Sequence, residues 1–482
     1  MEKLNIDCFI LIFNELQADK KSLYSCLLVN KEWYHLVVPI LWGNYPYFNC
    51  EKSKEKYSNI ILSCLPTSSK QLLFDNNIKL SSAILSNTLT FNYVSFCKFH
   101  RTGIIDNIIK VVFKENLSIV DYSKKRNLLE QEIYKLFISQ CEGIKELDWR
   151  TSQPLPSFPG AITFFSQLYS LYIDLYYVDS HNLYQMAQIC KDLNALYVRN
   201  FIQDIPGLIS LKNAQRNLKI ISFDFNIKKG TCEGLSEALA RKGCTINELS
   251  LFGSVGIIPH SFLTSLINLK DLTIYYDCEN YGGIKEFQKC LANSEFPNLQ
   301  FLEIDDGSLC FKELAMLIEK TKGNITYISV YMSNRSADNT GMLLKAISNH
   351  CPNIENLTTY IGSDDLIYVK SLLMDCNNLM SLCLNSFNEN NDMGDELLNI
   401  LIRFSPKYLT DITISGNLEY SISAFINFFE SYRERKPLCF YINDNGEHIT
   451  TGHVDVVNKY HGERIITSSN LLVYDHFNFA YN

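Results

Sequence analysis

A short apolar phrase recurs through most of this 482-residue chain. It has the form L-x-x-L-x-L, in which Ile, Val, Phe or Trp, and once Thr, can replace Leu. Successive copies begin 23 to 30 residues apart, at Ile144, Leu168, Leu193, Leu218, Ile246, Leu269, Leu299, Ile325, Ile354, Leu379 and Leu409. Repeats of this length predict a stacked array, in which each unit buries its apolar face against its neighbours.

Each repeat predicts one strand and one helix. The fourth and sixth positions of the phrase share a face of a short strand, because side chains alternate along a strand. Between copies, apolar residues recur at helical spacing, as in Leu235, Ala238 and Leu239. The predicted fold class is therefore α/β, a solenoid whose parallel strands line the inside of a curve.

Four cysteines stand three residues before the first apolar residue of their copy, at Cys141, Cys190, Cys351 and Cys376. We interpret them as small buried residues where a helix meets the next strand. The combined phrase C-x-x-L-x-x-L-x-L resembles the cysteine-containing class of leucine-rich repeats. The Asn that usually follows the strand in that class occurs only at Asn226 and Asn417, and Ser152, Ser254 and Ser333 take its place elsewhere. The repeats are therefore degenerate, and we expect their turns to vary.

The composition narrows the class of protein. The chain has 52 acidic and 44 basic residues, a net charge of −8, which argues against a general nucleic-acid binder. Sixteen scattered Cys are too few for a disulfide scaffold and suit a reducing compartment, so we expect the cytoplasm or nucleus. We expect no membrane association, because no apolar run could span a bilayer and the start is a poor signal peptide.

The sequence contains little that predicts chemistry. It has no P-loop, dinucleotide glycine motif, H-E-x-x-H motif or nucleophile elbow. Cys97 and His100 form a lone close pair, with no second pair to complete a zinc site. We therefore predict no metal, no cofactor and no enzymatic activity.

The first 45 residues do not carry the repeat. They predict three short helices, at about 5–16, 19–30 and 31–38, with Asp19 as an N-cap and Pro39 ending the third helix. So small a segment cannot be stable on its own core, and its apolar surface must be covered. The cover could be the solenoid, which the helices would then cap, or a partner protein.

The order of residues in this segment resembles an F-box. An opening Leu and acidic residue precede an apolar helix, an acidic turn, a Leu, a small residue, a Val, a Trp and a closing Leu-Trp. The residues that carry the resemblance are Leu4, Asp7, Ile12, Phe13, Leu16, Asp19, Leu23, Cys26, Val29, Trp33, Leu41 and Trp42. Asn5 stands where the motif usually has Pro. With its repeats, the chain resembles F-box leucine-rich-repeat proteins, of which fungi have large families.

This resemblance implies a substrate-recognition subunit of an SKP–cullin–F-box ubiquitin ligase. The F-box would bind the SKP-type adaptor, and through it a cullin–RING ligase, while the repeats hold a protein target. Other subunits would supply the chemistry, and this chain the proximity. Residues expected to contact the adaptor, or to form the core behind that contact, are Leu4, Ile6, Phe9, Ile12, Phe13, Leu23, Leu27, Val29, Trp33 and Trp42. The alternative is a non-catalytic leucine-rich-repeat scaffold whose front helices only cap the solenoid.

The third, fifth and seventh positions of each phrase point away from the core. They hold nine acids, eight aromatic residues and two bases, and such a surface either binds a basic protein or only keeps the solenoid soluble. The predicted target-binding residues are Glu146, Asp148, Tyr172, Asp174, Tyr197, Asp224, Glu248, Phe252, Asp271, Tyr275, Phe301, Glu303, Asp305, Tyr327 and Tyr331. The remaining members are Arg150, Arg199, Tyr360 and Asp411.

We divide the sequence into four parts. These are an F-box at 1–45, a helical linker with degenerate early repeats at 46–143, the leucine-rich-repeat solenoid at 144–445, and a tail or cap at 446–482. Within them we expect helices near 52–66 and 129–141, and a proline-rich loop at 150–160.

Overall fold

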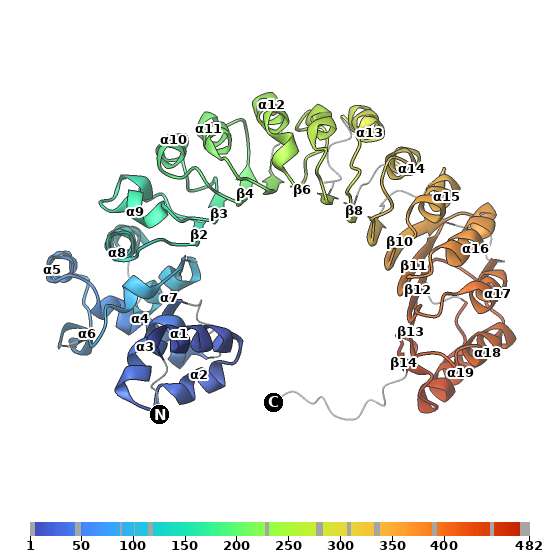
Figure 1. The fold of residues 1–482 in the computed structure, drawn as a ribbon, viewed down its shortest axis with the longest axis horizontal. Helices are drawn as coiled ribbons and strands as arrows, with labels where there is room; N and C mark the ends of the chain where they lie inside the picture. The colour runs from blue at the N-terminus through green and yellow to red at the C-terminus, as the bar shows by residue number, and fades with distance from the viewer. Residues whose placement is uncertain are drawn as a thin grey trace. The chain divides into compact units, whose positions relative to one another are not determined.

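The computed structural model describes residues 5–43, 50–86, 89–100, 102–113, 119–226, 231–275, 283–305, 310–331, 338–387, 393–443 and 448–472. The chain forms two compact units, residues 1–218 (unit 1) and 219–482 (unit 2). Each is described by itself, and both consist of helices and parallel strands (Figure 1).

Unit 1 begins with helices and ends with strand–helix repeats. Its front helices are α1 (Ile6–Glu15), α2 (Lys20–Cys26) and α3 (Lys31–Gly43). The helical middle contains α4 (Glu51–Ser63), α5 (Thr67–Asp75), α6 (Ser82–Ser86), the 3-10 turn η2 (Tyr93–Phe96), β1 (Phe99–His100), α7 (Thr102–Val112) and α8 (Ile119–Gln140). The repeats contain β2 (Glu146–Trp149), α9 (Ala161–Phe165), β3 (Ser170–Asp174), α10 (Ser180–Ile189), β4 (Ala195–Phe201) and α11 (Pro206–Ala214).

Unit 2 consists of strand–helix repeats throughout its described residues. Its strands are β5 (Ile220–Phe225), β6 (Glu248–Phe252), β7 (Asp271–Tyr275), β8 (Phe301–Asp305), β9 (Tyr327–Tyr331), β10 (Asn356–Ile361), β11 (Ser381–Ser386), β12 (Asp411–Ser415), β13 (Leu438–Asn443) and β14 (Ile466–Ser468). Its helices are α12 (Glu233–Arg241), α13 (Ile284–Asn293), α14 (Phe311–Ile318), α15 (Thr340–His350), α16 (Leu366–Asp375), α17 (Gly394–Phe404), α18 (Ile422–Glu430) and α19 (Thr451–Gly462), with the 3-10 turn η5 (His260–Ser265) between β6 and β7.

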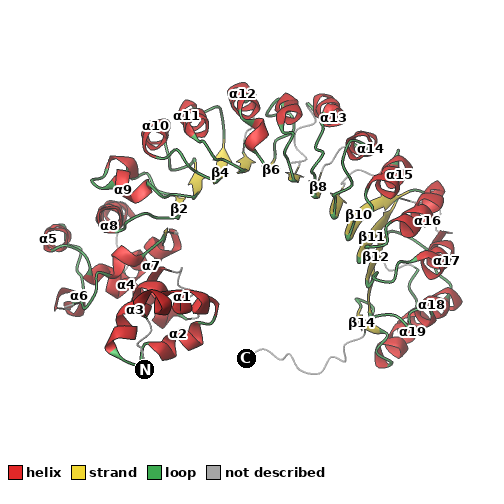
Figure 2. Ribbon diagram, in the orientation of Figure 1, coloured by secondary structure: helices red, strands yellow, loops and turns green. Residues whose placement is uncertain are grey.

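The strands of each unit pair in parallel, each with the next along the chain. In unit 2, for example, Leu249 pairs with Leu272, and Leu272 with Leu302. The helices of unit 2 lie on one side of its sheet, as Figure 2 shows, and the other side, the open face, carries no helix. This arrangement confirms the predicted α/β repeat fold.

The core consists of the positions that the repeat phrase marks. Every residue at the first, fourth and sixth positions of the eleven copies is at most 3% exposed. The helix residues Leu235, Ala238 and Leu239 are buried as well. The four cysteines that precede the phrase are buried, directly after a helix, as predicted.

The asparagines that would form a buried ladder in the repeat class do not do so here. Asn226 is exposed and Asn417 is half-buried. Ser254 is fully buried, whereas Ser152 is exposed, and Ser333 lies outside the described residues. The turns therefore vary along the array.

Three predicted helices lie at the front, but the prediction that Pro39 ends the third was wrong. Helix α3 continues through Pro39 to Gly43. Proline cannot donate to the carbonyl of residue i−4, which here belongs to His35. His35 is exposed, so that carbonyl can bind water instead. Asp19 is the N-cap of α2, as predicted, because its carboxylate accepts a hydrogen bond from the amide of Ser22 at 3.1 Å.

The strand ladder extends beyond the expected solenoid at both ends. Before residue 144, β1 already pairs with β2. After residue 445, α19 and β14 form a further helix and strand, and β14 pairs with β13, so residues 451–468 continue the array. The proline-rich segment at 150–160 is a loop, but it packs inward through Leu155.

Candidate partner-binding surfaces

The front helices form a small core of their own. Phe13, Leu23 and Val37 are buried in it, one from each helix. The Trp33 ring packs 5.4 Å from Phe9 and 5.1 Å from Phe13, between ring centroids. Of the residues expected to contact an adaptor or form the core behind it, Phe13 and Leu23 are therefore core, and Phe9, Leu27 and Trp33 are half-buried against it.

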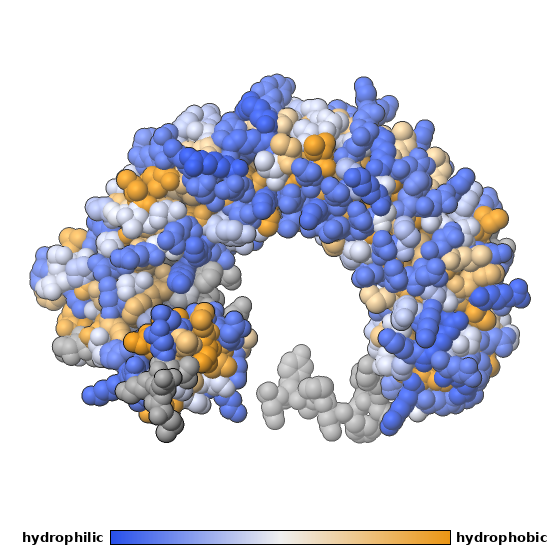
Figure 3. All heavy atoms as spheres, viewed as in Figure 1, coloured by the Kyte–Doolittle hydropathy of each residue, from blue (hydrophilic) through white to orange (hydrophobic). Residues whose placement is uncertain are grey.

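A set of large apolar side chains on the same helices remains exposed. We call this set the front patch: Ile6, Ile10, Leu11, Ile12, Tyr24, Leu28 and Val29. Leu28 is 88% exposed and Leu11 66%. Figure 3 shows apolar surface gathered over this part of the chain. Single exposed apolar residues are normal, whereas several large ones on one short helical segment make it a candidate binding surface.

The front patch matches the sequence prediction only in part. Ile6, Ile12 and Val29 were expected, and Leu4 lies outside the described residues. Sequence reasoning missed Ile10, Leu11, Tyr24 and Leu28, since the F-box resemblance did not include them. Their apolar character was visible, but which apolar residues the small core would leave outside was not.

Trp42, expected to contact the adaptor or to form the core behind that contact, packs against the helical middle of unit 1. Its ring stacks on Tyr57 with centroids 4.9 Å apart and lies 4.6 Å from Tyr93. Nearby, the Phe91 ring contacts Tyr34. Trp42 therefore joins α3 to the helices that follow.

The open face of unit 1 carries the first predicted target-binding residues. The rings of Tyr172 and Tyr197 stack on neighbouring strands, 4.2 Å apart and 5° from parallel. Asp174 accepts a hydrogen bond from Asn200 at 2.8 Å. Asp148 was expected to be open to a partner, but it is only 8% exposed and pairs with Arg150 at 2.8 Å.

The open face of unit 2 contains a region that we call the β6–β9 tile. It comprises the outward residues of four adjacent strands: Glu248, Ser250, Phe252, Asp271, Thr273, Tyr275, Phe301, Glu303, Asp305, Tyr327, Ser329 and Tyr331. All nine acidic and aromatic members were predicted target-binding residues. Asp224, the other predicted target-binding residue of unit 2, lies on β5 and is exposed.

Aromatic rings form two stacked pairs in the tile. The rings of Phe252 and Tyr275 lie 5.0 Å apart and 10° from parallel, and those of Phe301 and Tyr327 lie 4.2 Å apart and 6° from parallel. The Tyr275 hydroxyl also donates to Glu303 at 2.7 Å. The tile therefore has fixed flat surfaces, and its aromatic side chains are held by their neighbours.

The carboxylates of Glu248, Asp271 and Asp305 in the tile are partly desolvated. Burial raises the pKa of Glu248, and the nearby Asp271 raises it further, while Lys270 opposes the shift. Burial also raises the pKa of Asp271 and of Asp305. Burial, with the Glu303 carboxylate, raises the pKa of Tyr275 to about 12. The cost of desolvating these acids is only partly compensated within the chain, and a bound cation would offset more of it.

A cleft of about 680 Å³ lies in unit 1 between α7, α8 and the loop after β2. Three cations line it, Lys124, Arg126 and Arg150, together with three acids, Asp106, Glu130 and Asp174. Arg126 pairs with Asp106 at 3.2 Å. Because its charges balance, the cleft does not select a ligand of either sign.

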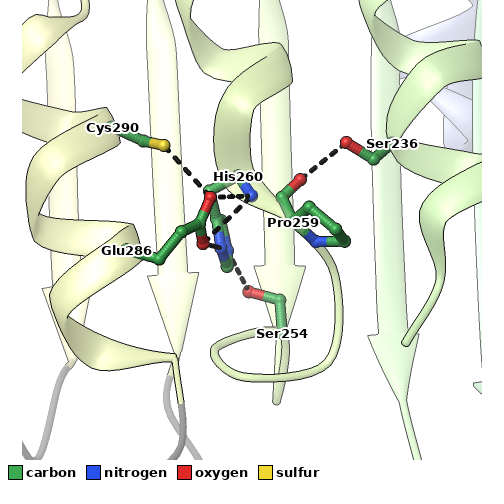
Figure 4. Close-up of polar contacts among 6 residues, drawn as sticks. All are labelled: Ser236, Ser254, Pro259, His260, Glu286 and Cys290. Atoms are coloured by element: carbon green, nitrogen blue, oxygen red, sulfur yellow. Dashed lines mark hydrogen bonds and ion pairs between the residues drawn. The ribbon is translucent and has the colours of Figure 1, made fainter. Parts of the chain in front are cut away.

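One cluster in unit 2 has the residue types of a hydrolase triad (Figure 4). Ser254 Oγ lies 3.3 Å from His260 Nε2, and His260 Nδ1 lies 3.8 Å from Glu286 Oε2. Ser254 and His260 are both 0% exposed, so no substrate carbonyl could reach the hydroxyl. Glu286 instead accepts from the His260 amide at 3.1 Å and from the Cys290 thiol at 3.2 Å. The cluster therefore fastens η5 to α13.

The described part of the chain offers neither a metal site nor a membrane-spanning helix. It contains no group of three His, Cys, Asp or Glu residues that could hold a metal ion. None of its helices is long and apolar enough to cross a membrane.

Comparison with known proteins shows similarity to solved structures only. No model of a known protein family matches the chain, and no curated protein matches it. Among solved structures, the crystal structure of the Rad7 and Elc1 complex in yeast matches with 15% sequence identity and a TM-score of 0.37. The match covers 76% of this chain and 89% of that chain.

Proposed function

We propose that this chain is a substrate-recognition subunit of an SKP–cullin–F-box ubiquitin ligase. The front helices would bind an SKP-type adaptor, and through it the cullin–RING ligase, while the repeats hold a protein target. The front patch is the observation that carries the proposal. Its side chains stay exposed although the helices already have a core, and burying such side chains under a partner is worth about 1.5–3 kcal/mol each.

The alternative is that the front helices only cap the repeats. Against it, the residues that meet the rest of unit 1 are different ones. Tyr34 and His35 contact Phe91, and Trp42 contacts Tyr57 and Tyr93. Tyr34, His35 and Trp42 all lie on α3, whereas the residues of the front patch lie on α1, α2 and the turn after α2. A pure cap would not need the second surface.

In this proposal the chain performs no chemistry. The Ser254–His260–Glu286 cluster is closed to substrate, and the proposed role needs only that adaptor and target bind at once. The cysteines that the structure describes are not joined in disulfides, which is consistent with the reducing cytoplasm or nucleus that we propose for this protein.

Capture of a purified SKP-type adaptor tests the proposal. The double variant Ile12→Asp with Leu28→Asp should weaken adaptor binding at least about tenfold, because it puts charge into the apolar contact. The matched control is Ile162→Asp with Ile202→Asp, two exposed residues of unit 1 outside the front patch, at 74% and 54% exposure. The control should bind like the unmodified protein.

Two further measurements make the result decisive. Far-UV circular dichroism should be the same for both double variants, since neither changes a core residue. A front-patch variant that folds and still binds the adaptor at full affinity would contradict the proposal, as would an unmodified protein that does not bind. Reconstituted ubiquitin transfer to a bound target would then establish the ligase role.

A further inference from the structure

The two aromatic pairs of the β6–β9 tile each end beside a carboxylate. Residues paired across neighbouring strands form a row, and the first row runs through the first residue of each strand. In this row, Asp271 of β7 is the direct neighbour of Phe301, which stacks on Tyr327. Along the fifth row, Asp305 of β8 is the direct neighbour of Tyr275, which stacks on Phe252. Adjacent strands lie about 4.8 Å apart, so a flat group placed against either ring also meets a carboxylate.

No cation of this chain occupies these places in the described residues. None of the ion pairs there includes Glu248, Asp271, Glu303 or Asp305. The charge of Lys270, just before β7, lowers the pKa of Glu248 and of Asp271, but less than burial raises it. All the outward residues of the tile are acidic, aromatic or hydroxyl-bearing, so its charge is of one sign.

A buried hydroxyl lies between the two rows. Ser329 is the direct neighbour of Glu303 and is 0% exposed. Its Oγ makes no hydrogen bond of normal geometry in the described structure, although the Tyr327 side chain lies beside it. Because Ser329 is fully buried, its hydroxyl belongs to the packing of the tile, and the surface open to a partner consists of the rings and carboxylates around it.

We propose that the β6–β9 tile binds an arginine-containing basic segment of the target protein, with one guanidinium beside Asp271 and Phe301 and a second beside Asp305 and Tyr275. Only the statement that this partner is the target of ubiquitin transfer rests on the proposed function. The binding of an arginine-containing segment does not depend on it. The two places are four residues apart along the strands, or roughly 13 Å. An extended segment with two arginines four residues apart presents both on one face and can reach both places.

The geometry favours arginine over lysine. A guanidinium is flat, so it stacks on an aromatic ring, and its fork of N–H groups matches a carboxylate. An ammonium group is a point charge with a strong hydration shell and gains less from a ring face. The rings are already stacked, and the carboxylates of Asp271 and Asp305 are already partly desolvated. Binding therefore requires little rearrangement of the tile.

The test uses the full chain and a fluorescent peptide of about ten residues, built from Gly and Ser with two arginines four residues apart. Fluorescence anisotropy gives its dissociation constant, and a peptide with two lysines serves for comparison. The first variant, Asp271→Asn with Asp305→Asn, keeps the shape of both side chains and removes their charge. The second, Phe301→Leu, keeps an apolar side chain and removes the ring face.

Matched controls separate recognition from general attraction to an acidic protein. Glu319→Gln with Glu396→Gln removes the same charge from exposed residues on the helix side of unit 2. We expect the Asn double variant to weaken arginine-peptide binding about tenfold or more, Phe301→Leu to weaken it severalfold, and the control to change it less than about twofold. The lysine peptide should bind severalfold more weakly to the unmodified protein.

Equal losses in the Asn variant and the Gln control would overturn the inference, since the attraction would then be non-specific. Equal affinities for the two peptides together with an unaffected Phe301→Leu variant would overturn it as well. Adaptor capture, measured on the same variants, should stay unchanged. If the unmodified protein fails to capture the adaptor while the tile binds the peptide as described, the proposed function fails and the recognition of arginine remains.

Discussion

At the scale of single residues, the carboxylates of this chain lie in two opposite environments. On the tile, burial raises the pKa of Asp271, against the opposing charge of Lys270, and burial with the nearby Glu303 raises the pKa of Asp305. At the end of α18, Glu430 pairs with Arg433 and accepts from the Tyr460 hydroxyl at 2.6 Å, and these contacts lower its pKa to about 2. The first environment suits an incoming cation, whereas the second already contains its own.

The Glu430 contacts predict a pH dependence of stability. The pKa of Glu430 falls from 4.5 to about 2, because Arg433, and then Tyr460, stabilise the carboxylate. A lowered pKa means that this contribution is complete above about pH 4.5 and disappears as the pH falls toward 2. Arg433→Met should therefore lose stability at pH 6 and lose less of it on acidification than the unmodified protein.

Urea unfolding followed by circular dichroism gives the free energy of unfolding. Measured at about pH 6 and about pH 3, it gives the difference between the variant and the unmodified protein at each pH. Arg241→Met is a suitable control, because Arg241 lies 3.6 Å from Glu237 in an exposed pair on α12. Its midpoint should shift with pH as that of the unmodified protein does. If the Arg433→Met curve also ran parallel to that of the unmodified protein, the Glu430 contacts would not stabilise the fold.

At the scale of elements, the sequence predicted those parts whose apolar spacing repeats. Leu302 and Ile304 of β8, for example, are buried at the positions that alternation along a strand requires. The repeat pattern did not predict β1 or β14. These strands have two and three residues, too few apolar positions for a pattern. Short elements at the ends of an array depend on pairing with a neighbour, which a local pattern does not record.

Helix α3 gives a prediction at this scale. Pro39 lies inside the helix, where it leaves the His35 carbonyl without its helical donor. Pro39→Ala should restore that hydrogen bond and raise the free energy of unfolding of unit 1 by about 1–2 kcal/mol. Two of the three Trp in the chain, Trp33 and Trp42, belong to α3, so Trp fluorescence during denaturation reports on this helix.

The matched control for this change is Pro66→Ala. Pro66 is the N-cap of α5, where a missing amide hydrogen costs the helix nothing. We expect its effect to stay within about 0.5 kcal/mol. A Pro39→Ala variant that is no more stable than Pro66→Ala would mean that packing of the proline ring, not backbone hydrogen bonding, decides the stability of α3.

At the scale of the whole molecule, the two proposed surfaces differ in how far the sequence defined them. Alternation along strands assigned the tile residues correctly, because the inward and outward positions of a strand differ in polarity. In the front helices, core and contact residues are equally apolar: Phe13 is buried while Leu28 is exposed. Only the packing of three helices against one another separates these roles, so the sequence could name the surface but not most of its members.

The last prediction concerns both surfaces together. The front patch ends at Val29 and the tile begins at Glu248, so they share no residue and no secondary-structure element. Sites without shared partners are expected to act additively. Saturating the tile with the arginine peptide should therefore change the affinity for the adaptor less than about twofold, and the adaptor should change peptide affinity as little. Calorimetric titration of adaptor into protein, with and without peptide, measures this coupling. Competition between the two ligands would contradict a subunit that holds target and ligase at the same time.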